Sequence, residues 1–295
     1  MSDTAKSQNH TAVPLPDATD WHKEWQTIME RCSSVARSEE GGIARWSEEA
    51  AAEFCSSLSV EYSDAMFRYA RPYLTPQATF LDVGCGPGTL AIPFAPHVSS
   101  ATAVDCSEEM LKLVRKRAEK DGLSNVSCVQ GFWRDLSPDA LASRPYDLAV
   151  SSNSIDLIAA KEIPGDDGRV TVDWNLADAL MRLARHSRHV LVSMPLLKPD
   201  LEGLHRLLGR EYRGWPGPQI VHNVIYQLGF RPSVTYFTYE QKSKTRSRWG
   251  FLPKLAWAEK LTPQEIELAE DFLATDDDSD DRMQLWILMA WDTGL

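Results

Sequence analysis

The chain has 295 residues, 43% of them hydrophobic, and a formal net charge of -11. This length and apolar content allow one main domain with a large core. The acidic balance disfavours nucleic acid as a partner, because phosphate binding draws on clustered Lys and Arg. No apolar run approaches the roughly 20 residues that cross a bilayer, so a membrane partner is disfavoured as well.

The first part of the chain divides into two segments. Residues 1–19 are polar and predict a disordered tail without a signal peptide. Residues 20–74 are rich in helix formers and aromatic side chains, which predicts an N-terminal helical cap. Five cysteines without paired metal-ligand spacing favour reduced thiols, a cytoplasmic location and no bound metal.

Three alternating glycines follow, at the point where an apolar strand gives way to an apolar-faced helix. Gly84, Gly86 and Gly88 can take positive φ and let the backbone approach a ligand closely. The spacing is D-x-G-x-G-x-G, not the G-x-G-x-x-G of a dinucleotide turn. The leading acid, Asp82, argues for a cationic ligand group instead of a phosphate.

Strands and helices then recur in alternation, which predicts an α/β fold with a parallel sheet covered on both faces. Strands are expected over residues 79–83, 101–105, 126–130, 147–151, 189–193, 233–239 and 284–291. Helices are expected from Thr89, Ser107 and Val172, and over residues 216–228, with proline at the start and Gly229 just beyond the end.

The motifs in this order resemble those of class I S-adenosylmethionine (SAM) dependent methyltransferases, including the domain found in ubiquinone and menaquinone biosynthesis enzymes and in uncharacterised prokaryotic members. Residues 82–88 match the first motif, and a strand ending in Asp105 matches the second. Residues 125–136 and 146–154 follow in the positions of the next two. The resemblance implies a Rossmann-like, doubly wound, seven-stranded mixed sheet over residues 75–295.

The resemblance also implies SAM as cofactor, with S-adenosylhomocysteine (SAH) as its product. At Phe132 the chain departs from the family, which usually has an acid there to meet the adenine. The positions that match the family's cofactor contacts are Asp82, Gly84, Cys85, Gly86, Gly88, Asp105, Cys106, Met110, Phe132, Trp133, Ser151 and Ser152.

Candidates for the acceptor side lie at the fourth-strand exit and in two added regions. Catalytic candidates are Asn153, Asp156, His222 and Tyr226, the last two one helical turn apart on a shared face. Substrate-binding candidates are Phe54, Tyr62, Asn153 and Tyr212. The insertion at 195–215 is expected to form a mobile lid or substrate loop.

The expected function is in-line methyl transfer from SAM to a small molecule, by a monomer or homodimer. The fourth-strand exit lacks the Asn/Asp-Pro-Pro-aromatic run of enzymes that methylate base or glutamine amines. Two alternatives stay open: a protein or RNA methyltransferase, and a SAM-binding protein without methyl transfer. The basic segment 242–248 is a solvated loop or a substrate contact, and the acidic segment 276–281 is solvated.

Overall fold

The computed structural model describes most of the chain, with several gaps. The described ranges are residues 19–32, 48–56, 59–196, 201–211, 214–240, 261–274 and 283–295. Three predicted features lie outside these ranges: Tyr212, the basic segment 242–248 and the acidic segment 276–281. Of the expected tail, only Thr19 is described.

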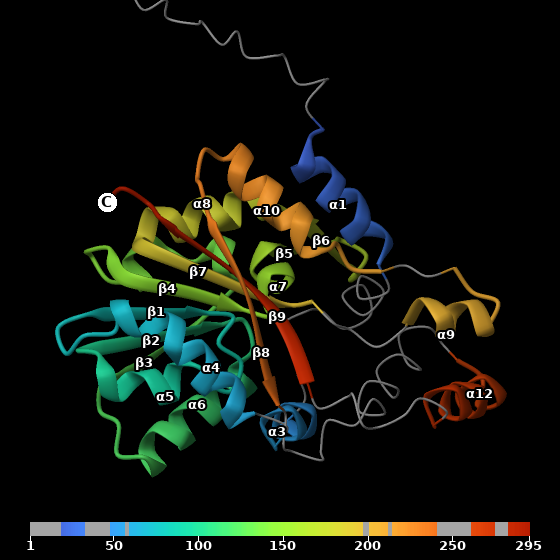
Figure 1. The fold of residues 1–295 in the computed structure, drawn as a ribbon, viewed down its shortest axis with the longest axis horizontal. Helices are drawn as coiled ribbons and strands as arrows, with labels where there is room; N and C mark the ends of the chain where they lie inside the picture. The colour runs from blue at the N-terminus through green and yellow to red at the C-terminus, as the bar shows by residue number, and fades with distance from the viewer. Residues whose placement is uncertain are drawn as a thin grey trace, which may run out of the picture.

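A seven-stranded sheet forms the centre of the molecule (Figure 1), in the order β3-β2-β1-β4-β7-β9-β8. Its strands are β1 (Thr79–Val83), β2 (Ser100–Asp105), β3 (Val126–Gln130), β4 (Tyr146–Ser152), β7 (Ser187–Pro195), β8 (Ser233–Glu240) and β9 (Met283–Asp292). In this order, neighbouring strands from β3 through β2, β1 and β4 to β7 pair in parallel, whereas β9 runs antiparallel to both of its neighbours. The expected seven-stranded mixed sheet is therefore confirmed.

Alternation along the strands sends apolar side chains to both faces, and each face carries its own core. Phe80, Leu148 and Leu191 face one core, together with Trp286. Their sequence neighbours in the strands, such as Leu81, face the other. A sheet buried on both faces requires a helical layer on each side.

The helices supply those two layers. Their bounds are α1 (Trp21–Arg31), α3 (Glu48–Ser56), α4 (Val60–Ala70), α5 (Ala91–Phe94), α6 (Glu108–Lys120), α7 (Ile155–Ala159), α8 (Leu176–His186), α9 (Leu201–Leu207), α10 (Pro218–Gln227) and α12 (Pro263–Ala274). Apolar residues of α4, α5 and α6 pack on one face of the sheet, and those of α1, α7, α8 and α10 pack on the other.

The helices of residues 20–74 do not form one separate cap. Helix α1 contacts α10 and α8, α3 contacts α6, and α4 contacts β8. Trp25 and Met29 of α1 are fully buried, so this helix is part of one core, while Tyr62 and Met66 of α4 belong to the other. Their amphipathic faces are thus used in different layers of the domain.

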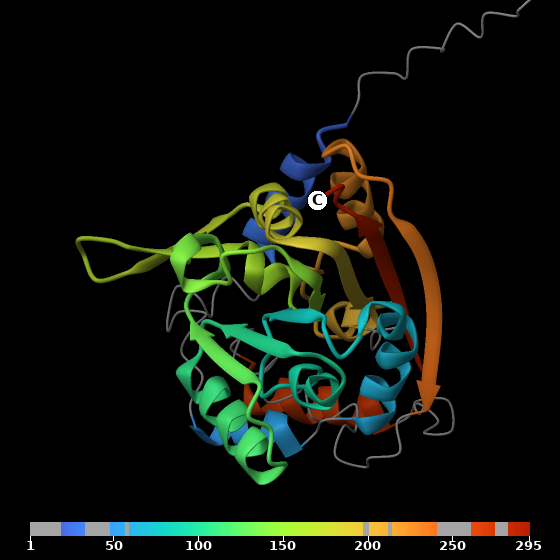
Figure 2. The ribbon, with the colours of Figure 1, turned by 90° about the vertical axis from the view of Figure 1, so that its left-hand side faces the viewer.

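The helix expected from Val172 is wrong. Residues 160–164 (β5) and 170–174 (β6) form an antiparallel hairpin, and α8 begins only at Leu176. Figure 2 shows this hairpin projecting from the body of the domain. Its base is fastened by Arg134, whose Nη1 donates to the carbonyls of Ala159 and Asp173 and whose Nη2 lies 2.7 Å from Asp173 Oδ2.

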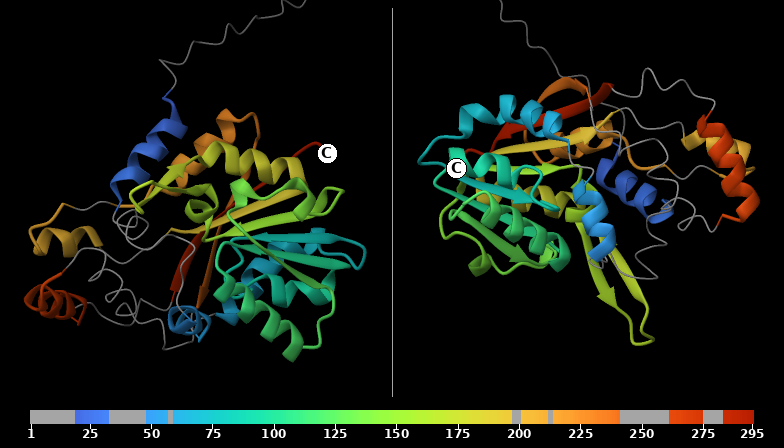
Figure 3. Two further views of the ribbon diagram at one scale, coloured as in Figure 1. Left: turned by 180° about the vertical axis from the view of Figure 1, so that it is seen from behind. Right: turned by 90° about the horizontal axis from the view of Figure 1, so that it is seen from below.

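In the insertion at 195–215 the structure describes one short helix, α9. It lies beside α12 in the views of Figures 1 and 3, to one side of the sheet. The two segments are joined by Arg210, whose Nε and Nη2 lie 2.9 and 2.8 Å from Glu265 Oε1. Within the described ranges, no helix has the length and apolar character to cross a membrane.

Candidate functional site

A cavity opens at the edge of the sheet where the parallel strands end. It is bordered by the turn after β1, the end of β2, the exit of β4 and the facing parts of β8 and β9. The lining residues are Phe54, Ser59, Tyr62, Asp82, Gly84, Cys85, Gly86, Thr89, Leu90, Asp105, Met110, Ser152, Asn153, Ser154, Leu157, Tyr239 and Trp286. Open α/β sheets bind their ligands at this edge.

The glycine turn forms one wall of the cavity. Gly84, Gly86 and Gly88 have φ angles of +72°, +52° and +79°, which side chains rarely adopt. A Cβ on Gly84 would lie 2.5 Å from the Cβ of Ser154, and one on Gly88 would lie 2.8 Å from Ile92 Cγ1. These two glycines are required by packing within the protein.

Gly86 differs from the other two, because a Cβ there would meet only Phe54 Cε1, at 3.7 Å. Its backbone therefore faces open space in the cavity. From behind, Arg117 of α6 donates through Nη1 to the carbonyls of Pro87 and Gly88 and holds the turn in place. The open side of the turn is available to a ligand.

Two buried acids stand beneath this turn. Asp82 Oδ2 accepts from the N–H of Ala91 at 2.9 Å, and the Asp105 carboxylate accepts from the N–H groups of Gly86 and Ser107, also at 2.9 Å. Burial raises the pKa of Asp82 to about 7, an effect that the Ala91 bond opposes and the charge of Asp105 reinforces. The pKa of Asp105 is also raised, chiefly by burial. Both carboxyls therefore favour a positively charged neighbour.

The exit of β4 forms the floor of the cavity. Asn153 has φ +52°, the one positive φ at a non-glycine residue in the described ranges, and its N–H donates to the Ser193 carbonyl. Asn tolerates this conformation better than most residues. Ser152 points to the face of the sheet covered by α4, where its Oγ is hydrogen-bonded to the hydroxyl of Tyr62.

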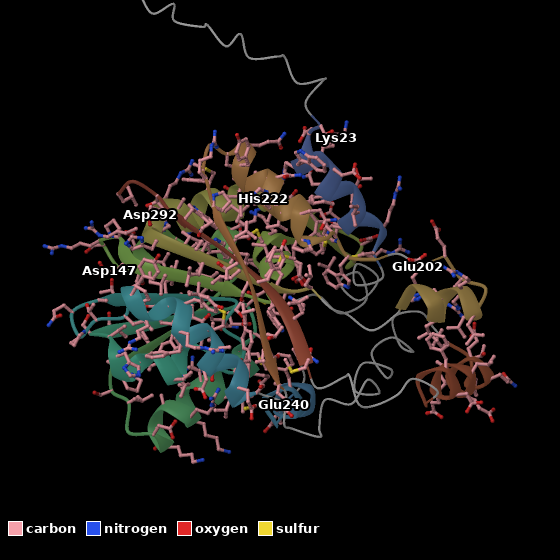
Figure 4. The ribbon with its side chains drawn as sticks, viewed as in Figure 1. Lys23, Asp147, Glu202, His222, Glu240 and Asp292 are labelled. Carbon is pink, nitrogen blue, oxygen red and sulfur yellow. The ribbon has the colours of Figure 1, made fainter. Side chains whose placement is uncertain are left out.

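Aromatic side chains form a further part of the cavity lining. We call Tyr62, Tyr239 and Trp286 the aromatic corner; they come from α4, β8 and β9. The Tyr62 ring centroid lies 4.4 Å from that of Trp286 and 5.5 Å from that of Tyr239. Phe237, which pairs in register with Trp286, packs behind them. Tyr239 lies next to Glu240, which ends β8 and is labelled in Figure 4.

Ten of the residues proposed from the sequence lie together in this lining. On the cofactor side they are Asp82, Gly84, Cys85, Gly86, Asp105, Met110 and Ser152, and on the acceptor side Phe54, Tyr62 and Asn153. Tyr212 falls outside the described residues.

The other proposed cofactor contacts do not line the cavity. Ser151 faces the opposite side of the sheet from Ser152, fully buried and bonded to Ser154 Oγ at 3.0 Å. Trp133 inserts into the core, where its Nε1 donates to the Ala179 carbonyl at 3.0 Å. Gly88, Cys106 and Phe132 are also absent from the lining.

Three of the proposed catalytic residues are also outside it. His222 and Tyr226 belong to α10, whose apolar side packs in the core on the other face of the sheet, and Figure 4 shows His222 in that layer. Tyr226 is 52% exposed and stacks under the guanidinium of Arg231. Asp156 lies in α7 and does not reach the cavity lining.

Seven lining residues had not been predicted: Ser59, Thr89, Leu90, Ser154, Leu157, Tyr239 and Trp286. A capping signal was present at Ser59, which accepts from the N–H of Tyr62 at the start of α4. Tyr239 and Trp286 carry no local signal, since their position depends on how β8 pairs with β9. In the described ranges, no group of three or more His, Cys, Asp or Glu side chains is placed to hold a metal.

Comparison with protein families identifies one matching model, the methyltransferase domain, over residues 80–165. This segment runs from the glycine turn through the exit of β4 to the β5–β6 hairpin. A relative from Haemophilus influenzae, described as an uncharacterized protein, is 28% identical over 162 residues. The match takes in 54% of this chain and about half of that relative's length, 53%.

Solved structures show the same fold at low sequence identity. YjhP from Escherichia coli is 17% identical, with a TM-score of 0.51 over 89% of this chain and 99% of that chain. A SAM-dependent methyltransferase from Geobacter sulfurreducens, solved in complex with SAH, is 16% identical, with a TM-score of 0.50 over 80% of this chain and 91% of its own. At these identities the likeness establishes the architecture.

Proposed function

We propose that this chain is a class I SAM-dependent methyltransferase, which binds SAM and transfers the methyl group to a small-molecule acceptor; the match of residues 80–165 to the methyltransferase domain supports the proposal. The observation that carries the proposal is the open backbone of Gly86 above two buried acids. SAM has a positively charged sulfonium and an ammonium group, so acids suit it better than a phosphate-binding turn would.

The residues present fit this cofactor. Gly86 leaves space where a side chain would intrude, and each of the two carboxylates keeps lone pairs free beyond its bonds to backbone N–H groups. Asp105 ends β2, the position from which a carboxylate accepts bonds from ribose hydroxyls. Asp82 offsets positive charge beneath the turn, and Met110 and Leu90 provide apolar walls.

When bound, the sulfonium supplies a methyl group that is already activated for displacement. The task of the protein is then to hold an acceptor atom in line with it, roughly 3 Å away, and to exclude water. The described lining contains no Lys, Arg or His. The proposed reaction therefore depends on positioning, with any proton leaving the acceptor through solvent or through the hydroxyls of Ser152 and Tyr62.

The small-molecule part of the proposal is supported by the walls of the cavity and by the charge of the chain. Side chains from α3, α4, β8 and β9 border the cavity together with the glycine turn, which favours a compact acceptor over a chain segment. The net charge of -11 also works against RNA as a substrate. An acceptor with few or no charges agrees with both features.

The proposal is tested by isothermal titration of the protein with SAM and SAH. We expect micromolar dissociation constants for both ligands, and a loss of affinity of tenfold or more in Gly86→Ala, because the added methyl group enters the ligand space. The matched control is Gly122→Ala: Gly122 has a φ of +66° and no atom within 4 Å of a built Cβ. Both variants should lose about 1 kcal/mol of stability from the positive φ.

Comparing the two variants distinguishes a direct effect on the ligand site from a general effect of strain at a positive φ. If Gly86→Ala binds SAH as well as Gly122→Ala does, the open turn is not the cofactor site. If neither ligand binds the unmodified chain, the proposed activity is wrong.

A further inference from the structure

The cavity lining combines two groups of residues with different chemistry. Both of its acids, Asp82 and Asp105, lie at the glycine turn. The aromatic corner, Tyr62, Tyr239 and Trp286, contributes rings, one indole N–H and phenolic hydroxyls but no charged side chain. Burial raises the pKa of Tyr62 further above its ordinary value, so its hydroxyl stays protonated. A charged molecule in this corner would lose its hydration without gaining an ionic partner from the three aromatic side chains themselves.

The rings of the corner are fixed before any ligand arrives. The Tyr62 hydroxyl is anchored to Ser152 and, at 2.8 Å, to Ser193 Oγ, and these two serines are paired in register on β4 and β7. The ring packs at 4.4 Å from Trp286 and is tilted by 40° to it. Rigid aromatic walls bind a flat molecule at a low entropic cost.

One polar group in the corner has no partner. Trp286 is 4% exposed, and its buried Nε1 has no acceptor among the described residues. Trp133, by contrast, donates its Nε1 to a backbone carbonyl at 3.0 Å. A buried donor without an acceptor is costly, and a ligand that brings an acceptor atom would recover that cost.

A cationic acceptor is disfavoured, although aromatic faces can attract cations. The Trp286 ring is partly covered by Tyr62, with which it is in close contact, so these rings do not form an aromatic cage around a cation. In the proposed reaction the neighbouring ligand is itself a sulfonium, and two positive charges a few ångströms apart repel each other.

We infer that the aromatic corner is the acceptor subsite and that it selects an uncharged, planar molecule with a hydrogen-bond acceptor for the Trp286 N–H. The inference rests on the proposed function, because it assigns the acceptor half of the same cavity. It adds the chemical class of substrate and names Trp286 as a specificity-determining residue.

The test uses a matched set of bicyclic probes on the full chain with saturating SAH, with binding measured by ligand-observed NMR and calorimetry. Naphthol is planar, neutral and polar, whereas naphthoate and naphthylmethylammonium carry opposite charges on the same ring system. Naphthalene lacks the polar atom, and decahydronaphthol lacks planarity. We expect naphthol to bind at least about tenfold more tightly than either charged probe or decahydronaphthol.

Two tryptophan variants then test the indole N–H. Trp286→Phe keeps an aromatic face and removes the donor, so naphthol should bind about fivefold to tenfold more weakly, the cost of one hydrogen bond, while naphthalene is unaffected. Trp291→Phe is the control: it lies on the same strand, is 5% exposed and also has an unpartnered buried Nε1, but it belongs to the core on the other face. It should leave all probe affinities unchanged.

The inference is overturned if naphthoate or the ammonium probe binds as tightly as naphthol, if Trp286→Phe and Trp291→Phe act alike, or if naphthol displaces SAH. The probe series on the unmodified chain decides the charge selectivity even if a variant does not fold. If SAH itself fails to bind, the proposed function is wrong, and the probe titrations without SAH still decide what the corner selects.

Discussion

Tyr62 joins three elements through a single hydroxyl group. It brings α4 to the ends of β4 and β7 by bonds to Ser152 and Ser193, while its ring closes the aromatic corner. The serines are held side by side by the parallel pairing of their strands. This residue therefore contributes to stability and to the shape of the cavity at once.

Removing that hydroxyl should be measurable. Tyr62→Phe retains the ring but leaves two serine hydroxyls without their shared partner, and we expect a loss of about 1 to 2 kcal/mol in the free energy of unfolding. Denaturant titration measures it. Tyr226→Phe, at a half-exposed position, is the control and should change stability by less than about 0.5 kcal/mol. Equal effects of the two variants would contradict the anchoring role.

Asp82 gives the cavity a pH dependence with a definite sign. Its pKa of about 7 in the ligand-free protein means that it is largely protonated below that pH. A ligand with an ammonium group favours the ionised carboxylate, so binding releases a proton and affinity rises with pH. We expect SAH to bind about tenfold more tightly near pH 8 than near pH 6, levelling off once Asp82 is ionised.

Asp82→Asn is the corresponding variant. The amide oxygen can still accept from the Ala91 N–H, so the start of α5 is retained while the titrating group is removed. Calorimetry across the pH range should give a flatter profile for Asp82→Asn than for the unmodified chain. Glu108→Gln, at a partly exposed acid outside the cavity lining, should retain the full slope. An unchanged slope in Asp82→Asn would exclude this carboxyl as the group responsible.

Among the elements, the β5–β6 hairpin depends on one buried cation. The Arg134 side chain is 8% exposed, and it bonds two backbone carbonyls as well as Asp173 and Asp178. Arg134→Met should cost about 2 to 3 kcal/mol, and Arg134→Lys should recover little of it, since one ammonium cannot span all four acceptors. Hydrogen exchange should show faster exchange localised to residues 159–174.

A surface ion pair on the same hairpin provides the comparison. Lys161 and Asp135 are paired at 2.6 Å, but both side chains are about 40% exposed. Lys161→Met should therefore change stability by less than about 1 kcal/mol and leave exchange in the hairpin unaltered. A loss as large as that of Arg134→Met would mean that burial does not determine the strength of these contacts.

The elements also show what the sequence could predict. Strands β1 and β3 lie where their apolar runs indicated, and α10 has the expected proline at its start and Gly229 beyond its end. The sequence predicts a helix start at Val172, where the structure has the β5–β6 hairpin. The alternation of Val170, Val172 and Trp174 after the turn residues Gly165 to Gly168 was the available signal.

The residues of the cavity lining also differ in how far the sequence predicts them. The glycine turn was predictable because Asp82, Gly84 and Gly86 form a local motif with a direct conformational meaning. The choice between Ser151 and Ser152 depends on which face of β4 meets α4, which is a tertiary property. Trp286 and Tyr239 meet through the register of two strands that are distant in the chain, so no local pattern marks them.

At the scale of the whole molecule, the glycine turn and the two acids come from the segment that matches the methyltransferase domain, and the aromatic corner comes from outside it. Tyr62 precedes residues 80–165, while Tyr239 and Trp286 follow them. Hydrogen exchange with each ligand should reflect this division. SAH should slow exchange at the glycine turn and the β4 exit, and naphthol should slow it in residues 235–240 and 284–288. Protection of both sets by SAH alone would contradict two separate groups of residues.

The position of β9 in the sheet has a consequence for how the protein is made. This strand lies between β7 and β8, yet it follows both of them along the chain. During translation, the edges of β7 and β8 that pair with β9 stay unpaired until residues 283–292 have been synthesised. Strands β1 to β4 can already associate by then. The glycine turn can thus assemble on a nascent chain that still lacks Trp286, and the aromatic corner is completed after it.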